Sequence, residues 1–111
     1  MKTADFVSKC GLKWFVKADG TREITGGYFG DLLSWVMSRA KCGDAWITIM
    51  SNINTLAVAS LCEAACIVLA DGVEPEENVV QTAQAKGINV IGSEEPAYNL
   101  ACELSECLKS E

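Results

Sequence analysis

Apolar positions follow two alternating patterns along this chain. Short, largely apolar runs predict buried strands, and the segments between them, with apolar residues every three or four positions, predict helices. Because strands that are apolar on both faces alternate with helices, the pattern predicts an α/β fold with a mostly parallel sheet of about five strands flanked by helices on both faces. The expected strands are 12–16, 24–29, 45–50, 66–70 and 88–91, and the expected helices are 3–10, 32–43, 55–62, 75–86 and 96–108.

Glycine and proline mark several of these boundaries. Gly11 and Gly87 directly follow predicted helices, where a C-cap glycine can adopt the left-handed conformation. Pro75 is expected within the first turn of its helix, the position where proline is tolerated. With 111 residues and no linker or low-complexity tract, residues 1–111 are expected to form a single domain with one core.

The charge balance narrows the classes of partner. The formal net charge is −6 and the basic residues are scattered, whereas nucleic-acid binding depends on phosphate neutralisation by Lys and Arg. The longest apolar stretch, Leu56–Leu69, is interrupted by Ser60, Cys62 and Glu63, and is too short to span a bilayer. The first residues carry no apolar signal core. We therefore expect a cytoplasmic protein that binds neither nucleic acid nor membrane.

Catalytic groups are few. The chain has no histidine, which excludes His-based acid–base catalysis, Ser-His or Cys-His pairs and every His-containing metal site. Three glycines precede the predicted helix at Leu32, but neither a P-loop nor the G-x-G-x-x-G fingerprint is present. No nucleophile–base pair stands out, so we do not expect an enzyme.

The carboxyl ends of parallel strands are the expected place for a ligand. Loops at those ends carry glycines, hydroxyls, amides and acids beside helix starts, where a nucleotide or another phosphorylated molecule can be held. Ser, Asn and Asp at helix starts also serve as N-caps, which is the competing interpretation, and no basic residue lies among them. The residues expected there are Gly26, Gly27, Gly30, Ser51, Asn52, Asn54, Thr55, Asp71, Gly72, Ser93 and Glu94.

The glycines of Thr25-Gly26-Gly27 also have a structural interpretation. Without a following lysine, this segment is a poor phosphate cradle. We expect its glycines to permit close packing, either within the domain or against a second copy of the chain.

The six cysteines divide into two groups. Cys10, Cys62 and Cys107 fall on apolar helix faces and Cys66 opens a buried strand, as expected for small hydrophobic residues. Cys62 and Cys66 are spaced C-x3-C, but no second pair lies nearby to complete a metal site. No structural disulfide is expected in a cytosolic protein, and no cofactor is predicted. The alternative is a redox or iron–sulfur-associated protein that uses Cys62, Cys66 and Cys102.

Cys102 differs from the other helical cysteines because it projects from the side of the closing helix opposite its apolar face. Tyr98 is adjacent on that side, and Trp35 also lies off the apolar face of its own helix. Exposed aromatic residues are enriched at protein interfaces. Trp35, Tyr98 and Cys102 are therefore candidates for a subunit or partner surface, although an irregular edge of the core would explain them as well.

The segment Arg22–Gly27 resembles the signature of DRTGG domains, which are named for residues that their members share. The resemblance continues through Gly30–Ser34, Gly43–Thr48 and Asp71–Pro75, and so covers nearly the whole chain. Thr21 stands where the family has an acidic residue before the arginine. A salt bridge or ligand contact made by that acid would require Asp19 as a substitute.

The resemblance implies a regulatory role. DRTGG domains lie beside nucleotide-sensing CBS domains in some inorganic pyrophosphatases and precede some phosphate acetyltransferases, and the N-terminal domain of HPr kinase/phosphorylase is similar in fold. Stand-alone members accompany iron-only hydrogenase genes, and members tend to pair with another copy. The resemblance to these domains therefore implies a homodimeric regulatory or assembly module that senses a small ligand and serves an enzyme of hydrogenase or phosphotransfer metabolism. The candidate ligand-binding residues are Arg22, Thr25, Gly26, Gly27, Ser51, Asn52, Asn54, Asp71 and Ser93.

Overall fold

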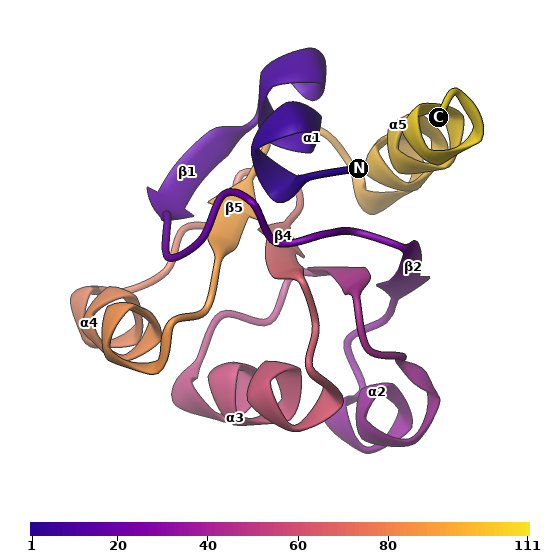
Figure 1. The fold of residues 1–111 in the computed structure, drawn as a ribbon. Coiled ribbons are helices and arrows are strands. Elements are labelled where there is room, and N and C mark those ends of the chain that lie inside the picture. Colours follow the sequence, from indigo (N-terminus) through magenta and orange to yellow (C-terminus); the bar gives the residue numbers. More distant parts are fainter.

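A computed structural model describes residues 1–111 as one five-stranded sheet between two layers of helices (Figure 1). The predicted fold class is confirmed, with every expected strand and helix present. In chain order the elements are α1 (Thr3–Cys10), β1 (Lys13–Val16), β2 (Gly26–Phe29), α2 (Leu33–Arg39), β3 (Asp44–Thr48), α3 (Ile53–Cys62), β4 (Cys66–Leu69), α4 (Glu77–Lys86), β5 (Val90–Gly92) and α5 (Ala97–Lys109).

The strands are arranged in the order β1-β5-β4-β3-β2. Strands β2 to β5 are parallel, and β1 lies antiparallel to β5 at one edge. Since consecutive parallel strands are neighbours, each crossover from β2 to β5 advances the sheet by one strand. The opposite edge is β2, whose outer side has no pairing strand.

Two apolar cores lie on the two faces of this sheet. Helices α2, α3 and α4 cover one face, and α1 and α5 cover the other (Figure 1). Successive residues of a strand point to opposite faces, and β3 shows this clearly: Trp46 packs in the core beneath α2 to α4, while Ala45 and Ile47 pack beneath α1 and α5. Burial on both faces explains the unbroken apolar runs of the central strands.

The turn after β2 is held against β3 by polar contacts. The indole Nε1 of Trp46 donates a hydrogen bond of 2.9 Å to the carbonyl of Gly30. The Asp31 carboxylate accepts from the Thr48 hydroxyl at 2.7 Å and from the Ile49 amide at 3.0 Å. Gly30 and Asp31 therefore have a structural role in joining β2 to β3.

The long segment between β1 and β2 crosses the amino ends of the parallel strands, where the buried side chain of Asn89 holds it. The amide oxygen of Asn89 accepts from the backbone of Ala18 and Asp19, both at 2.9 Å. Its nitrogen donates to the carbonyls of Asp19 at 2.8 Å and Ala65 at 3.2 Å. A fully satisfied buried amide of this kind fixes the path of a loop.

Two boundary predictions can be compared with the structure. Gly11 and Gly87 are left-handed C-caps, with φ of 62° and 71°, so those predictions are confirmed. The prediction that Pro75 lies in the first turn of α4 is wrong, because the carbonyl of Glu76 accepts from Val79 and Val80 and the helix starts at Glu77, two residues after Pro75. No helix in the structure combines the length and apolar character needed to cross a bilayer.

Candidate functional site

The loops after β4 and β5 leave the sheet in opposite directions. The chain after β4 runs to α4 on one face, and the chain after β5 runs to α5 on the other (Figure 1). Adjacent parallel strands with diverging loops form the switch point at which open α/β sheets bind ligands. A cavity of about 460 Å³ lies there, and it is called the switch-point cavity below.

Backbone contacts between the two loops shape this cavity. The amide of Asp71 donates to the carbonyl of Glu95 at 2.8 Å, and the amide of Gly72 donates to that of Ser93 at 2.9 Å. Asp71 and Gly72 both have positive φ, 57° and 74°. A side chain at Gly72 would displace the exposed carboxylate of Glu94, and the left-handed backbone there favours glycine.

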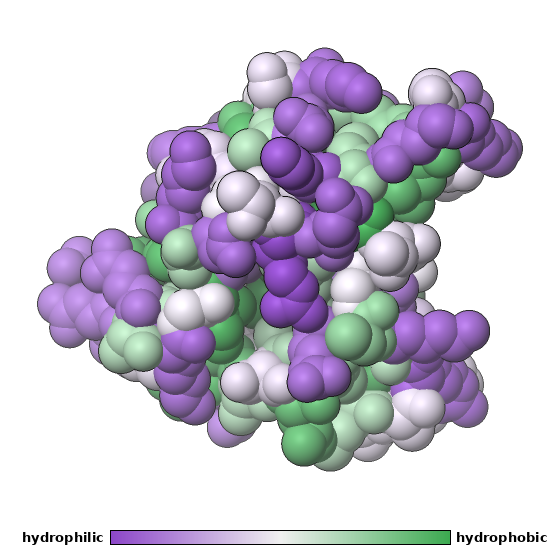
Figure 2. Space-filling view, viewed as in Figure 1, coloured by the Kyte–Doolittle hydropathy of each residue, from purple (hydrophilic) through white to green (hydrophobic).

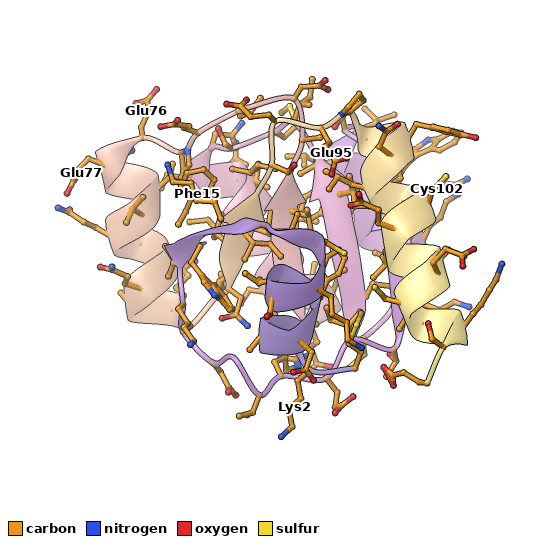
Figure 3. All side chains as sticks on the ribbon, turned by 90° about the horizontal axis from the view of Figure 1, so that it is seen from above. Lys2, Phe15, Glu76, Glu77, Glu95 and Cys102 are labelled. Carbon is orange, nitrogen blue, oxygen red and sulfur yellow. The ribbon has the colours of Figure 1, made fainter.

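The charge of the switch-point cavity is mainly negative. Glu74, Glu94, Glu95 and Glu103 line it together with one basic residue, Lys13. Figure 3 shows Glu95 where the chain enters α5. Desolvation by burial, followed by the nearby carboxylate of Glu95, raises the pKa of Glu103, and one of its buried oxygens has no hydrogen-bond partner. A phosphate group would be repelled here.

Only part of the predicted carboxyl-end site gathers around this cavity. Ser93 lines the cavity, and Asp71 lies at the start of the loop that joins β4 to α4. Ser51, Asn52 and Asn54 lie at the neighbouring end of β3 and do not line the cavity. Ligand contact at these positions stays a prediction.

The capping interpretation is confirmed for Asn52. Its side chain accepts from the Thr55 amide at 3.1 Å, and the Thr55 hydroxyl accepts from the Asn52 amide at 3.4 Å, which together form a capping box at the start of α3. The Ser93 hydroxyl similarly accepts from the amide of Glu95 at 3.0 Å.

Four further candidates, Arg22, Thr25, Gly26 and Gly27, do not lie at the carboxyl ends of the strands. Gly26 is the first residue of β2, so this segment lies at the amino ends of the parallel strands. The placement of Gly26 and Gly27 at the carboxyl edge is therefore wrong. Arg22 Nη2 donates to the carbonyl of Glu63 at 2.7 Å, at the end of α3, where a cation is favoured by the helix dipole.

A second hollow surrounds the start of β2. Its lining includes Thr25 and Gly26 together with Arg39, Lys41 and Asp44, its volume is about 440 Å³, and it is called the glycine hollow below. Its two basic residues are not among the site residues expected from the sequence. A right-handed crossover returns the chain from α2 to the amino end of β3, beside the amino end of β2, and this topology could have placed them.

Both glycines of this segment are needed for packing within the domain. A Cβ on Gly27 would lie 2.6 Å from Cδ2 of Leu104 on α5, and a Cβ on Gly26 would lie 2.8 Å from Oδ1 of Asp44. These separations are shorter than van der Waals contact allows. The expectation of close packing within the domain is thus supported by geometry at both positions.

The predicted interface residues lie on helices that flank the β2 edge. Trp35 belongs to α2 on one face of the sheet, and Tyr98 and Cys102 belong to α5, which packs on β2 and β3 from the other face. All three are exposed, and Cys102 points away from the sheet (Figure 3). The guanidinium of Arg39 lies 3.9 Å from the centre of the Trp35 ring.

The cysteines of the metal alternative do not converge. Cys62 contacts backbone carbonyls of α2, Cys66 is fully buried with a pKa raised to about 12 by desolvation, and Cys102 is on the surface. No group of three or more Cys, Asp or Glu side chains could hold a metal ion. No observation in the structure favours a cluster at these cysteines.

Comparison with known proteins identifies the fold and nothing finer. No protein-family model and no curated protein matches the sequence. The structure is similar to the CBS and DRTGG domains of the regulatory region of Clostridium perfringens pyrophosphatase, solved in complex with its activator diadenosine tetraphosphate. The TM-score is 0.71 at 10% identity, over 93% of this chain and 45% of that chain.

The chain has a DRTGG-like fold. This agrees with the resemblance carried by Arg22–Gly27, and it shows the architecture without showing membership of the family. This chain spans less than half of that pyrophosphatase region.

Proposed function

We propose that this protein is a non-catalytic regulatory or assembly module that forms a homodimer through the edge of its sheet at β2 and senses a small phosphorylated ligand. The observation that carries this proposal is the concentration of exposed apolar side chains around β2. Similarity to a pyrophosphatase regulatory region supports the regulatory class of function.

The β2 edge has the features of a surface that needs a partner. Its backbone is unpaired on the outer side, and an open edge strand readily pairs with another chain. Of the eight exposed large apolar residues, six lie in β2, in or beside α2, directly after β3, or in α5. We call these six the β2-edge patch: Phe29, Leu32, Trp35, Met37, Ile49 and Tyr98.

A groove adds apolar area at the same edge. Gly27, Phe29, Ile47, Leu104 and Leu108 are among the residues that line it, between β2 and α5, and its volume is about 250 Å³. Figure 2 shows the surface hollowed between α5 and α2 on this side, with apolar surface on the inner side of α5. A second copy of the chain would cover the groove and the β2-edge patch together.

The glycine hollow is the better place for a phosphorylated ligand. Arg39 and Lys41 supply positive charge, whereas the switch-point cavity is lined mainly by carboxylates. Tyr28 and Gly27 of β2 also line the glycine hollow. A ligand bound there would touch the strand that forms the subunit contact, so binding and assembly would be coupled. An enzyme of hydrogenase or phosphotransfer metabolism is the expected recipient of that signal.

Light scattering combined with a thermal-shift screen tests both parts of the proposal. Nucleotides and phosphorylated metabolites form the screen, and the dimer is measured with and without each compound that raises the melting temperature. A Lys41→Ala variant should lose the response, and Lys86→Ala, an exposed lysine on α4, is the matched control. A monomer that responds to no compound would contradict the proposal.

A further inference from the structure

Two cysteines from opposite ends of the chain meet in the fold. The Sγ atoms of Cys10 and Cys107 lie 3.8 Å apart, although the residues are separated by 97 positions. Cys10 is the last residue of α1 and Cys107 lies in the last turns of α5. The two thiols therefore lie where α1 and α5, the helices that cover one face of the sheet, meet.

No other pair of thiols in the chain is so placed. Cys62 is occupied with the carbonyls of Val36 and Met37, and Cys66 is fully buried in β4. Cys42 and Cys102 are exposed and have no sulfur neighbour within hydrogen-bond range. The Cys10–Cys107 contact is thus specific to one pair out of six cysteines.

The two sulfur atoms are only a short movement away from bonding distance. A disulfide bond is about 2.0 Å long, so they must move together by roughly 1.8 Å from their separation in this structure.

Cys10 is also accessible to small reagents, because it lines the switch-point cavity. We propose that Cys10 and Cys107 are the site of a reversible disulfide bond that locks α1 to α5.

The oxidant is a low-molecular-weight disulfide such as glutathione disulfide. One thiol of the pair, as its thiolate, attacks glutathione disulfide, which forms a mixed disulfide with the protein and releases one molecule of reduced glutathione. The second thiol, as its thiolate, then attacks the protein sulfur of this mixed disulfide, forms the Cys10–Cys107 bond and releases a second molecule of reduced glutathione. The protein loses two protons and two electrons in total.

The raised pKa of Cys10 affects both the formation and the reduction of this disulfide bond. Desolvation by burial, and then the neighbouring Cys107 thiol, raise the pKa of Cys10 to about 12. Since Cys10 keeps its proton near neutral pH, little of its reactive thiolate is present and the pair is oxidised slowly. Because its thiolate is poorly stabilised, the disulfide resists reduction once it has formed. The bond would act as a slow switch that restrains one wall of the switch-point cavity.

The test uses the full chain with Cys42→Ser and Cys102→Ser, which removes the two exposed thiols. The reduced protein is incubated with glutathione disulfide, alkylated, and measured by intact mass and peptide mapping. We expect two thiols to be lost, a Cys10–Cys107 cross-linked peptide, and a melting temperature that rises by several degrees and returns on reduction.

Single substitutions provide the controls. Adding Cys10→Ser or Cys107→Ser should abolish the cross-link, whereas Cys62→Ser should leave it unchanged. Free thiols at both positions after prolonged oxidation would overturn the proposal. Separate glutathione adducts on the two cysteines, or a cross-link between other residues, would overturn it equally.

Discussion

Replacing Gly27 with alanine tests which of two roles the glycines of β2 perform. The added methyl group would lie 2.6 Å from Cδ2 of Leu104, about 1 Å inside ordinary van der Waals contact. Leu104 is only 4% exposed and packs in the core beneath α5, so moving it away from residue 27 would disturb that packing. Overpacking of this kind costs about 1–3 kcal/mol, and alanine regains about 0.5 kcal/mol of backbone entropy.

The net loss for Gly27→Ala is therefore about 0.5–2.5 kcal/mol of unfolding free energy, or roughly 3–15 °C in melting temperature for a domain of this size. Urea denaturation followed by circular dichroism measures it. Gly30→Ala is the control, because the nearest atoms to its Cβ belong to the half-buried side chain of Tyr28. That change should shift stability by less than about 0.5 kcal/mol.

A double-mutant cycle identifies the atom responsible. Leu104→Val removes both Cδ atoms, so Gly27→Ala should have no destabilising effect in that background. If the loss persists there, steric conflict with Leu104 is not its cause. If Gly27→Ala leaves stability unchanged but abolishes self-association, the glycine serves contact with a second copy instead.

Two other substitutions test polar contacts. Glu103→Gln should stabilise the protein by about 1 kcal/mol at pH 7, because it replaces a carboxylate that has a buried, unpartnered oxygen but is partly screened by solvent. The pKa of Glu103 is raised in the folded state, so its ionisation disfavours folding only as pH rises through that value. The gain should accordingly disappear in melts below about pH 4, and a gain that is independent of pH would refute the assignment. Asn89→Ala removes a side chain that makes four hydrogen bonds and should lower unfolding free energy by about 2–3 kcal/mol in urea denaturation, whereas a loss below about 0.5 kcal/mol would mean that water replaces those contacts.

The elements of this fold could be predicted because their signals are local. The apolar runs at β3, β4 and β5 and the glycine caps at residues 11 and 87 depend only on neighbouring residues. Pairing depends on distant parts of the chain, and the sequence offers no signal that β1 lies antiparallel beside β5. The parallel crossovers were predictable because strands alternate with helices.

The candidate site was harder to predict, since it depends on direction and on contacts across the fold. Gly26 and Gly27 were placed at the wrong end of the sheet because strand pairing begins only at residue 26. Arg39 and Lys41 reach the glycine hollow only because α2 returns the chain to the start of β2. Cys10 was expected on an apolar helix face, but its pairing with Cys107 follows from the contact between α1 and α5, which no local pattern encodes.

Self-association through β2 can be decided by sedimentation velocity over a range of protein concentrations. Phe29 is 55% exposed at the end of β2, and Leu61 is 66% exposed on α3, away from that edge. We predict that the wild-type chain and Leu61→Asp sediment as dimers, while Phe29→Asp weakens the dimer at least about tenfold, or about 1.4 kcal/mol. A wild-type monomer at every concentration, or a dimer that Phe29→Asp leaves intact, would contradict it.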